Sequence, residues 1–420
     1  MASVTTGSEN NRKRFRARSG RLALTCIALW WTGLPMAGDV SFNPELSLEA
    51  EYGDNVIVSS DNEEISDVSS RLRVVLPILN TWDTGSLLFS YAPSIERYRD
   101  VDQLDNDAHD LIFSVDDRPS RQSVFHVELG FTRSLDQGMS ASSLGEELFL
   151  TPPSERDRLS GEVSYARQVG RRWGWNGMLD AADLTYNEID GGGFPGETIE
   201  DRREYGAAAG LDYILSPQST FGVLLQYRSN ELEFSGSEDL QQLSLVWDRT
   251  LGRGSDLNLE LGVSDRSGEF LLVGQLMPES ISDTELFGGI EWTRTMRQAR
   301  LQLMASRRPS AGGASRSTST DSLVSVGLSG TPDRSWNWTV AARYASRDPQ
   351  DSALEVTDSL GAGAQIEWRP TEHTGYRIGL DYVDQSSDAE VADRSLGRAW
   401  IGFVWYPRGP EGPTLEEEEE

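Results

Sequence analysis

The sequence predicts an all-β fold, a transmembrane antiparallel up-and-down β-barrel of about 18 strands (about 16–18) with short periplasmic turns and long external loops. Three observations predict it. Apolar and polar residues alternate with period two through the chain after residue 38. Short connections alternate strictly with long polar ones along that stretch. It also lacks any apolar run of about 20 residues, which a transmembrane helix needs.

The first 38 residues have the pattern of a secretory signal peptide. Residues 11–21 are cationic (NRKRFRARSGR), residues 22–34 are apolar (LALTCIALWWTGL), and small residues follow in PMAGD. This pattern predicts cleavage near Ala37 or Gly38, with a buried helix or a retained membrane anchor as the alternative. The only cysteine, Cys26, lies inside the apolar run. The mature chain therefore needs no disulfide in an oxidising compartment.

Charge excludes some classes of protein. The 420 residues carry 67 acidic and 38 basic side chains, a net charge of -29. Removing residues 1–38 leaves 32 basic and 66 acidic side chains. Such an acidic chain lacks the basic face that binds phosphates, so we expect no nucleic-acid partner. The many tryptophans, tyrosines and phenylalanines exclude a disordered chain.

The alternation identifies strands with one apolar face. In the segment TFGVLLQYRSN (220–230), Phe221, Val223, Leu225 and Tyr227 fall on one face, and Gly222, Gln226 and Arg228 on the other. Segments 123–132, 204–215, 240–249, 257–263, 335–344 and 398–406 repeat the pattern. Successive side chains of a strand point to opposite faces of its sheet, so each segment is a predicted β-strand.

The connections give the strands their arrangement. Short turns such as 80–85 and 251–254 are rich in Gly, Asp and Asn, whereas residues 134–155, 187–201 and 307–321 are long and polar. Placing all long loops at one end is typical of barrels in the outer membrane of Gram-negative bacteria. We expect the barrel over residues 39–407 and both of its ends on the short-turn side. No loop is long and apolar enough to be an obvious plug, and residues 135–157 are the candidate.

Strand phase assigns side chains to lipid or lumen. Leu225, Leu245, Leu259, Ile378 and Phe403 are expected to face lipid, so arginine at Leu245 should destabilise the barrel while arginine at Ser244 should be mild. An aromatic girdle is predicted from tryptophans near strand ends and from Phe403: Trp173, Trp175, Trp247, Trp292, Trp336, Trp338, Trp368 and Trp405.

The predicted lumen is polar and net negative, so water should fill it and a conducting pore should prefer cations. Opposite charges on facing walls would set up a transverse field. The predicted inward acids are Glu49, Glu51, Glu96, Asp110, Glu128, Glu162, Asp180, Asp212, Asp248, Glu260, Glu291, Glu367 and Asp381. The predicted inward arginines are Arg71, Arg73, Arg228, Arg343 and Arg377.

Two clusters of polar residues are candidates for a catalytic site and a metal site. His126 and Glu128 share the predicted lumen face, but no nucleophile accompanies them at a recognisable spacing, so we expect a solvated pair and no enzyme. Asp100, Asp102, Asp105 and Asp107 gather in one external loop. Clustered carboxylates suit Ca²⁺, but the spacing is not that of an EF-hand, and a solvated acidic loop is the alternative. No other cofactor is expected.

Residues 89–123 (FSYAPSIERYRDVDQLDNDAHDLIFSVDDRPSRQS) and 306–330 (SRRPSAGGASRSTSTDSLVSVGLSG) resemble hairpins of a known family. It is a family of bacterial outer-membrane β-barrels associated with exopolysaccharide biosynthesis and export loci, also described as β-barrel porins. The resemblance implies a channel or scaffold that assists exopolysaccharide export, with polysaccharide and export components as partners.

Residues 408–420 (RGPEGPTLEEEEE) depart from that family's frequent ending on an aromatic residue. They are predicted to form a solvated acidic tail, with Phe403 and Trp405 as the aromatics of an internal signal for the barrel-insertion machinery. Three functions remain at this point: the export channel or scaffold, a general diffusion porin for small solutes that prefers cations, and a barrel enzyme, which nothing positive supports.

Overall fold

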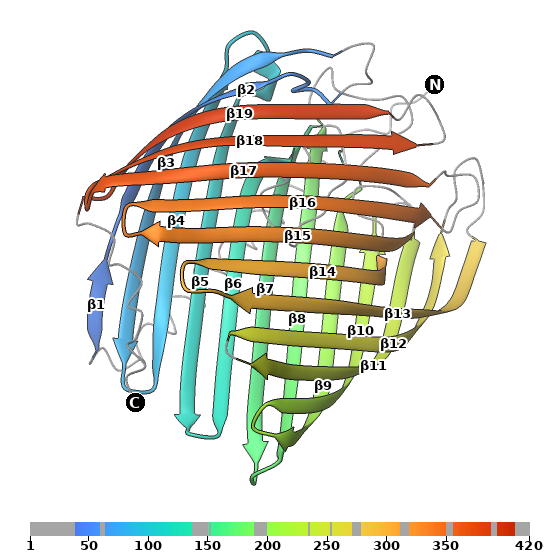
Figure 1. The fold of residues 1–420 in the computed structure, drawn as a ribbon. Helices are drawn as coiled ribbons and strands as arrows, with labels where there is room; N and C mark the ends of the chain where they lie inside the picture. The colour runs from blue at the N-terminus through green and yellow to red at the C-terminus, as the bar shows by residue number, and fades with distance from the viewer. Residues whose placement is uncertain are drawn as a thin grey trace, which may run out of the picture.

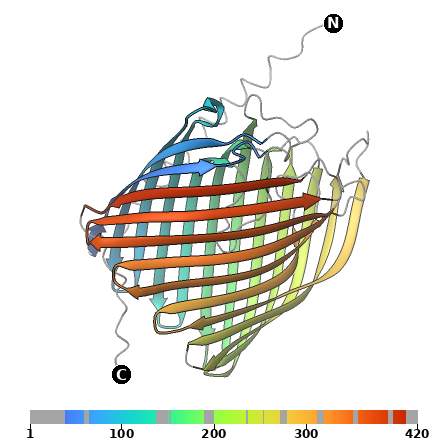
Figure 2. The ribbon, with the colours of Figure 1, turned by 45° about the horizontal axis from the view of Figure 1, so that its top comes forward.

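The computed structural model is a closed antiparallel β-barrel (Figures 1 and 2). It describes residues 38–58, 64–136, 150, 153–188, 200–233, 236–252, 254–270, 279–310, 319–349, 356–387 and 393–407. The predicted signal peptide, except for residue 38, and the predicted acidic tail lie outside these residues. Among the described residues, no helix has the length and apolar character to cross a membrane.

Strands make up nearly all of the described chain, with one short 3₁₀ turn, η1 (Asp102–Leu104). The strands are β1 (Asp39–Phe42), β2 (Glu45–Gly53), β3 (Asp67–Trp82), β4 (Gly85–Tyr98), β5 (Asn106–Ser120), β6 (Ser123–Asp136), β7 (Ser154–Val169), β8 (Trp173–Glu188), β9 (Arg202–Ser216), β10 (Ser219–Leu232), β11 (Gly236–Gly252), β12 (Ser255–Phe270), β13 (Glu279–Thr295), β14 (Ala299–Ser310), β15 (Ser319–Asp333), β16 (Trp336–Pro349), β17 (Thr357–Thr371), β18 (Thr374–Ser387) and β19 (Arg394–Trp405).

Eighteen strands, β2 to β19, close the barrel. Each pairs with the next strand along the chain, and β19 returns to pair with β2 from Arg398↔Gly53 to Trp405↔Leu46. β1 begins, and β19 ends, beside short turns (Asp39↔Thr81, Trp405↔Thr374). The predicted fold class and the position of both ends on the short-turn side are confirmed.

β1 and β2 are two halves of one strand. Both pair with β3 in a single continuous register, from Asp39↔Thr81 to Gly53↔Asp67. The ladder is interrupted at Asn43 and Pro44, which stand opposite Pro77 and its neighbour in that register. Proline has no N–H to donate, so Pro44 and Pro77, at neighbouring positions of the two strands, remove ladder hydrogen bonds from both.

The two faces of the barrel wall differ in chemistry. One face exposes a row of large apolar side chains, with Leu225, Ile378 and Ile401 all more than half exposed. The other face carries charged side chains that meet across intervening strands. Arg377 of β18 lies 3.4 Å from Glu45 of β2, past β19. Contacts across an intervening strand are favoured on the concave face, so the charged face lines the lumen and the apolar face meets lipid.

A seam interrupts the regular wall between β13 and β14. Their pairing covers only Gly288↔Arg307 to Thr295↔Arg300, whereas β13 pairs with β12 along its whole length. In Figure 1 the first half of β13 curves away from β14 at the right-hand side. A Cβ on Gly288 would lie 2.7 Å from the Glu260 carbonyl oxygen, so the bend requires glycine at this point.

The wall overlaps at this seam. Lumen-facing Arg266 of β12 donates through Nη2 to the carbonyl oxygen of Ser319, at 2.9 Å, and Thr320 donates to Glu285 of β13 at 2.7 Å. The external ends of β14 and β15 therefore cover the lumen face of β12 and β13. Arg266, only 1% exposed, lies 2.9 Å from a carboxylate oxygen of Glu238 and 3.7 Å from one of Glu285. We call Arg266, Glu238 and Glu285 the seam cluster.

Candidate functional site

The candidate site is the lumen, since that face gathers the charged side chains. The register places every predicted inward residue on the lumen face, including Glu128 and Glu162, which stand directly opposite each other on β6 and β7. The other members of the predicted set on this face are Asp212, Arg228, Asp248, Glu260, Arg343, Glu367, Arg377 and Asp381. These placements describe position alone and leave their role in transport as a prediction.

One side of the lumen, from β6 to β11, is lined by accessible carboxylates. Glu128, Glu162 and Asp180 are neighbours across three strands, and Asp212 and Asp248 follow nearer the turns. All five are exposed or half-buried, although they lie on the concave face. Within the described residues none of the five forms an ion pair; Asp212 and Asp248 accept hydrogen bonds only from the amides of Asn176 and Asn258. We call these five residues the acidic wall.

The opposite side, from β16 through β19 to β3, carries arginines that are largely paired. Glu367 accepts from Arg369 at 2.6 Å and from the Tyr406 hydroxyl at 3.2 Å, and Arg377 lies 3.4 Å away. Arg343 is 1% exposed. The guanidiniums of Arg369 and Arg377 are held against Glu367, so much of their charge is compensated within the wall.

Arg71, on the same side, lies 2.9 Å from a carboxylate oxygen of Glu96. Arg398 lies 3.7 Å from Glu51, and Arg73 lies 3.8 Å from Asp110 and is half exposed. The lumen thus sets accessible carboxylates on one wall against arginines on the other. A solute in such a lumen experiences a field directed across the pore.

Sequence reasoning missed more than half of the arginines that the described residues place on the lumen face. Their signal was the same alternation, but they fall near strand ends and in segments without a clear apolar face. They are Arg156, Arg158, Arg202, Arg266, Arg308, Arg347, Arg369, Arg394 and Arg398. The same face also carries acids outside the predicted set, among them Glu238, Glu285 and Asp321, which lie beside some of these arginines. The accessible negative charge is therefore concentrated in the acidic wall.

Ser244 faces the lumen as predicted, but its side chain is packed. It is on the lumen face but only 2% exposed, between Leu224 and Gly262. A Cβ on Gly262 would meet the Phe287 ring at 2.5 Å. The space over Ser244 is filled, so arginine there would be crowded, and we now expect a destabilising effect at Ser244 in place of a mild one.

The external end of the lumen holds an apolar cluster. Leu150, which lies between β6 and β7, is buried with Val58, Ala345, Val383 and Leu396. Its backbone N–H donates to the Gln385 side chain on β18 at 2.8 Å. Leu150 thus lies against the inner wall of β16, β18 and β19, where it narrows the lumen. Most of the predicted plug stretch, residues 137–149 and 151–152, lies outside the described residues.

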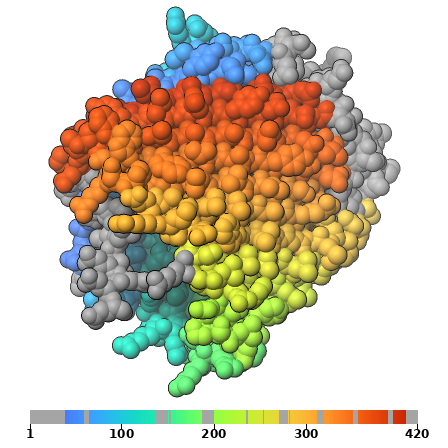
Figure 3. Space-filling model, in the orientation of Figure 1, coloured from blue at the N-terminus to red at the C-terminus, as the bar shows by residue number. Residues whose placement is uncertain are grey.

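The described residues leave a hollow at the short-turn end. Figure 3 shows a hollow at the lower left, bounded by orange, yellow and green strand ends, with teal residues of the far wall visible inside. Together with the accessible carboxylates deeper in the barrel, this hollow indicates a lumen that water can enter from the periplasmic side.

The histidines show no catalytic arrangement among the described residues. His126 Nδ1 lies 2.8 Å from Asp116, not beside Glu128. His109 faces outward, where its ring stacks on Tyr91, and His373 contacts the Tyr406 carbonyl oxygen. On the lumen face, His126 and Asp116 form a hydrogen-bonded pair, which is an ordinary structural contact.

The acidic external loop is held together by arginines and backbone. Asp105 and Asp107 lie 3.6 and 2.7 Å from Arg97, and Asp105 also accepts from the Tyr98 N–H. Asp100 lies 3.9 Å from Arg99, and Asp102 opens η1. The part of the chain that the structure describes gathers no group of three or more residues that could hold a metal ion. The calcium prediction gains no support from this loop.

The outer face carries two different aromatic belts. The predicted girdle residues Trp247, Trp292, Trp338, Trp368, Phe403 and Trp405 all lie on it, and all lie at the short-turn end. Four aromatic side chains of neighbouring strands lie one against the next, with ring centroids 5.6–5.9 Å apart: Trp336, Trp368, Tyr376 and Phe403. Tyrosines such as Tyr227, Tyr344 and Tyr382 occupy the other end. Aromatic belts of this kind mark the membrane interfaces.

A closed barrel with an apolar outer band and aromatic belts has the architecture of bacterial outer-membrane proteins, and the chain is an outer-membrane β-barrel. No protein-family model and no curated protein matches it.

Solved structures similar to it include the FrpB iron transporter from Neisseria meningitidis (9% identity, 87% of this chain and 68% of that one, TM-score 0.48). Two others are OccK9 (OpdG) from Pseudomonas aeruginosa (14%, 87% and 98%, 0.46) and Pseudomonas aeruginosa OpdL (11%, 88% and 99%, 0.44).

Proposed function

We propose that this barrel is a diffusion channel that admits small cations and neutral solutes and disfavours anions. The observation that carries the proposal is the acidic wall: five lumen carboxylates that water reaches and that no described cation neutralises. Fixed charge along a water-filled pore concentrates ions of opposite sign and depletes those of the same sign. The paired arginines of the opposite side do not cancel this effect, because much of their charge is already compensated by Glu96, Glu367 and Glu51.

We expect the wild-type channel in a planar bilayer to give a reversal potential on the cation-selective side in a KCl gradient. The preference should weaken with rising salt, because the Debye length falls from about 10 Å at 0.1 M to about 3 Å at 1 M. The variant Glu128→Gln/Glu162→Gln/Asp180→Asn should move the reversal potential toward zero, since it removes three neighbouring charges of the acidic wall.

A matched control separates lumen charge from total charge. Glu231→Gln/Asp348→Asn/Asp384→Asn removes three exposed carboxylates from the outer face, on β10, β16 and β18. It should leave the reversal potential unchanged. Equal shifts in both triple variants, or an anion preference in the wild type, would contradict the proposal.

Assistance to exopolysaccharide export is the second candidate. Its support is the resemblance of residues 89–123 and 306–330 to a family associated with export loci. The acidic wall restricts the cargo to a neutral or cationic polymer, because an anionic chain would meet like charges along several strands. Neutral oligosaccharides added to the planar bilayer should then produce transient blocks of the current, whereas anionic ones should not.

A further inference from the structure

Three arginines on the outer face at the short-turn end have no carboxylate partner. Arg167 of β7, Arg249 of β11 and Arg294 of β13 are exposed and alternate with lumen residues. Among the described residues, none of the three forms an ion pair. The chain has almost twice as many acidic as basic side chains, yet these arginines on the lipid-facing surface have no acidic partner in the part that the structure describes. An anion from outside the protein could therefore pair with them.

The three arginines share the same surroundings. Each pairs directly with the serine that begins the preceding strand: Ser123↔Arg167, Ser219↔Arg249 and Ser255↔Arg294. Two residues before each arginine is an aromatic ring on the same face, Tyr165, Trp247 or Trp292. In two of the three, the indole Nε1 donates to that serine hydroxyl, Trp247 to Ser219 at 2.8 Å and Trp292 to Ser255 at 2.9 Å.

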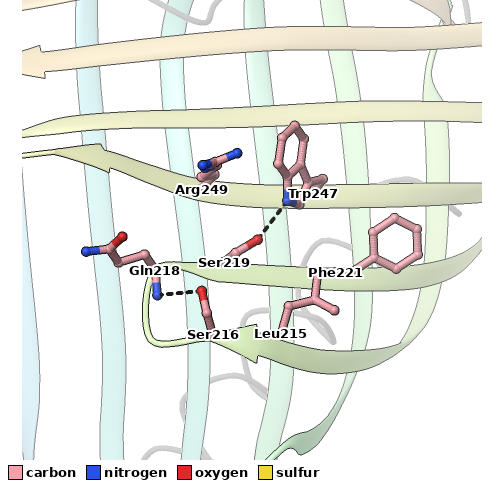
Figure 4. Close-up of a pocket in the computed structure, with 7 residues that line it drawn as sticks. All are labelled: Leu215, Ser216, Gln218, Ser219, Phe221, Trp247 and Arg249. Carbon is pink, nitrogen blue, oxygen red and sulfur yellow. Dashed lines mark hydrogen bonds between the residues drawn. The ribbon is translucent and has the colours of Figure 1, made fainter.

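The arginine, serine and aromatic group on β10 and β11 also has a hollow of about 510 Å³ beside it (Figure 4). Gln218, Ser219 and Arg249 lie at the turn end of this hollow, and Leu215 and Phe221 lie toward the middle of the strands. The Arg249 guanidinium sits 5.6 Å from the centroid of the Trp247 ring, which keeps it over the hollow.

The turn geometry widens this hollow. The pairing of β9 with β10 shifts between Ser219↔Ser216 and Thr220↔Ile214, so Leu215 is an extra residue in its strand. An extra residue bends the strand and re-aims its side chain. Leu215 is 53% exposed and forms the side of the hollow opposite Trp247. The site thus combines a polar end at the membrane surface with an apolar end toward the bilayer centre.

We propose that the hollow around Arg249 and Trp247 binds an anionic phospholipid of the periplasmic leaflet, with its phosphate on Arg249 and an acyl chain along Leu215 and Phe221. Guanidinium groups pair well with phosphate oxygens, and indole rings favour the headgroup depth. Charge complementarity selects an anionic headgroup, because no carboxylate lines the site. The opening onto the lipid face, with apolar residues inside, favours a lipid over a soluble anion.

Native mass spectrometry on the delipidated, folded barrel tests this proposal. The detergent-solubilised protein is titrated with phosphatidylglycerol, with phosphatidylcholine, and with phosphatidylglycerol in the presence of excess inorganic phosphate. We expect the tightest bound lipid to be phosphatidylglycerol. Arg249→Gln should weaken that binding about fivefold, the factor that corresponds to roughly 1 kcal/mol for one arginine at a lipid surface. Arg249→Lys should retain part of the affinity.

The matched control is Arg307→Gln. Arg307 is also exposed on the outer face, but it lies toward the external end of β14 and pairs with Gly288 and Ser322, without an aromatic ring. Its removal should leave the tightest binding unchanged. Retained heat-modifiable migration in gels shows that each variant is folded. Equal weakening by Arg249→Gln and Arg307→Gln, equal affinity for phosphatidylcholine, or displacement of the lipid by inorganic phosphate would each overturn the proposal.

Discussion

Replacing Arg266 by methionine is expected to lower the free energy of unfolding by about 3–5 kcal/mol, because the change removes the nearest cation from buried Glu238 and half-buried Glu285. Arg266 is 1% exposed and lies between Glu238, itself 2% exposed, and Glu285. Its Nη2 also holds the carbonyl oxygen of Ser319, so the substitution loosens the external ends of β14 and β15 as well. Urea unfolding of the barrel in lipid vesicles, followed by tryptophan fluorescence, measures the difference.

Two further variants test whether charge, rather than volume, causes this loss. Arg266→Met/Glu238→Gln/Glu285→Gln removes the stranded charges and should recover a substantial part of the stability. Arg228→Met removes a lumen arginine that is exposed, and it should change stability by less than about 1 kcal/mol. If Arg266→Met were no more destabilising than Arg228→Met, the seam cluster would not hold the overlapping wall together.

Arginine in place of Leu245 is expected to destabilise the barrel by about 2–4 kcal/mol, because it places a charge in the hydrocarbon region. Leu245 is 47% exposed on the outer face, between Val223 and Leu261 of the neighbouring strands. The same unfolding measurement in vesicles reports the loss.

The control for this charge insertion is Gln242→Arg, on the lumen face of the same strand. Gln242 pairs with Gln226 and Ser264, both polar, and is half-buried. It is a better control than Ser244, whose side chain is packed. A cost at Gln242 as large as that at Leu245 would mean that lumen and lipid faces of β11 had been exchanged.

The sequence was sufficient for the architecture because one physical rule, the alternation of side chains across a strand, acts at every position. Leu225 and Gln226 are assigned to opposite faces by that rule alone. The alternation of short turns with long loops then gave the closed antiparallel order. The concentration of tryptophan at one end was also present in the sequence, since Trp173, Trp247, Trp292 and Trp368 all neighbour short turns.

Features that depend on three or more strands could not be predicted in this way. The seam arises where Gly288 lets β13 bend, and the glycine pair in the sequence also suited an ordinary barrel strand. The pairing of Arg377 with Glu45 joins residues from opposite ends of the chain. The burial of Leu150 depends on an inner-wall patch assembled from β16, β18 and β19. Local patterns carry no information on such distant neighbours.

The hydrogen bonds between β19 and β2 have a consequence for the order of assembly. They join residues such as Trp405 and Leu46, from the two ends of the barrel sequence, so they form only after the last strand has been delivered. Until then, β2 and the most recently added strand each present a free edge that could recruit another chain. Joining ends so far apart in the sequence also costs more loop-closure entropy than pairing neighbouring strands does, which makes this contact slow to form. The edge of β2 is therefore open to mispairing throughout assembly, and closure of the barrel removes both free edges at once.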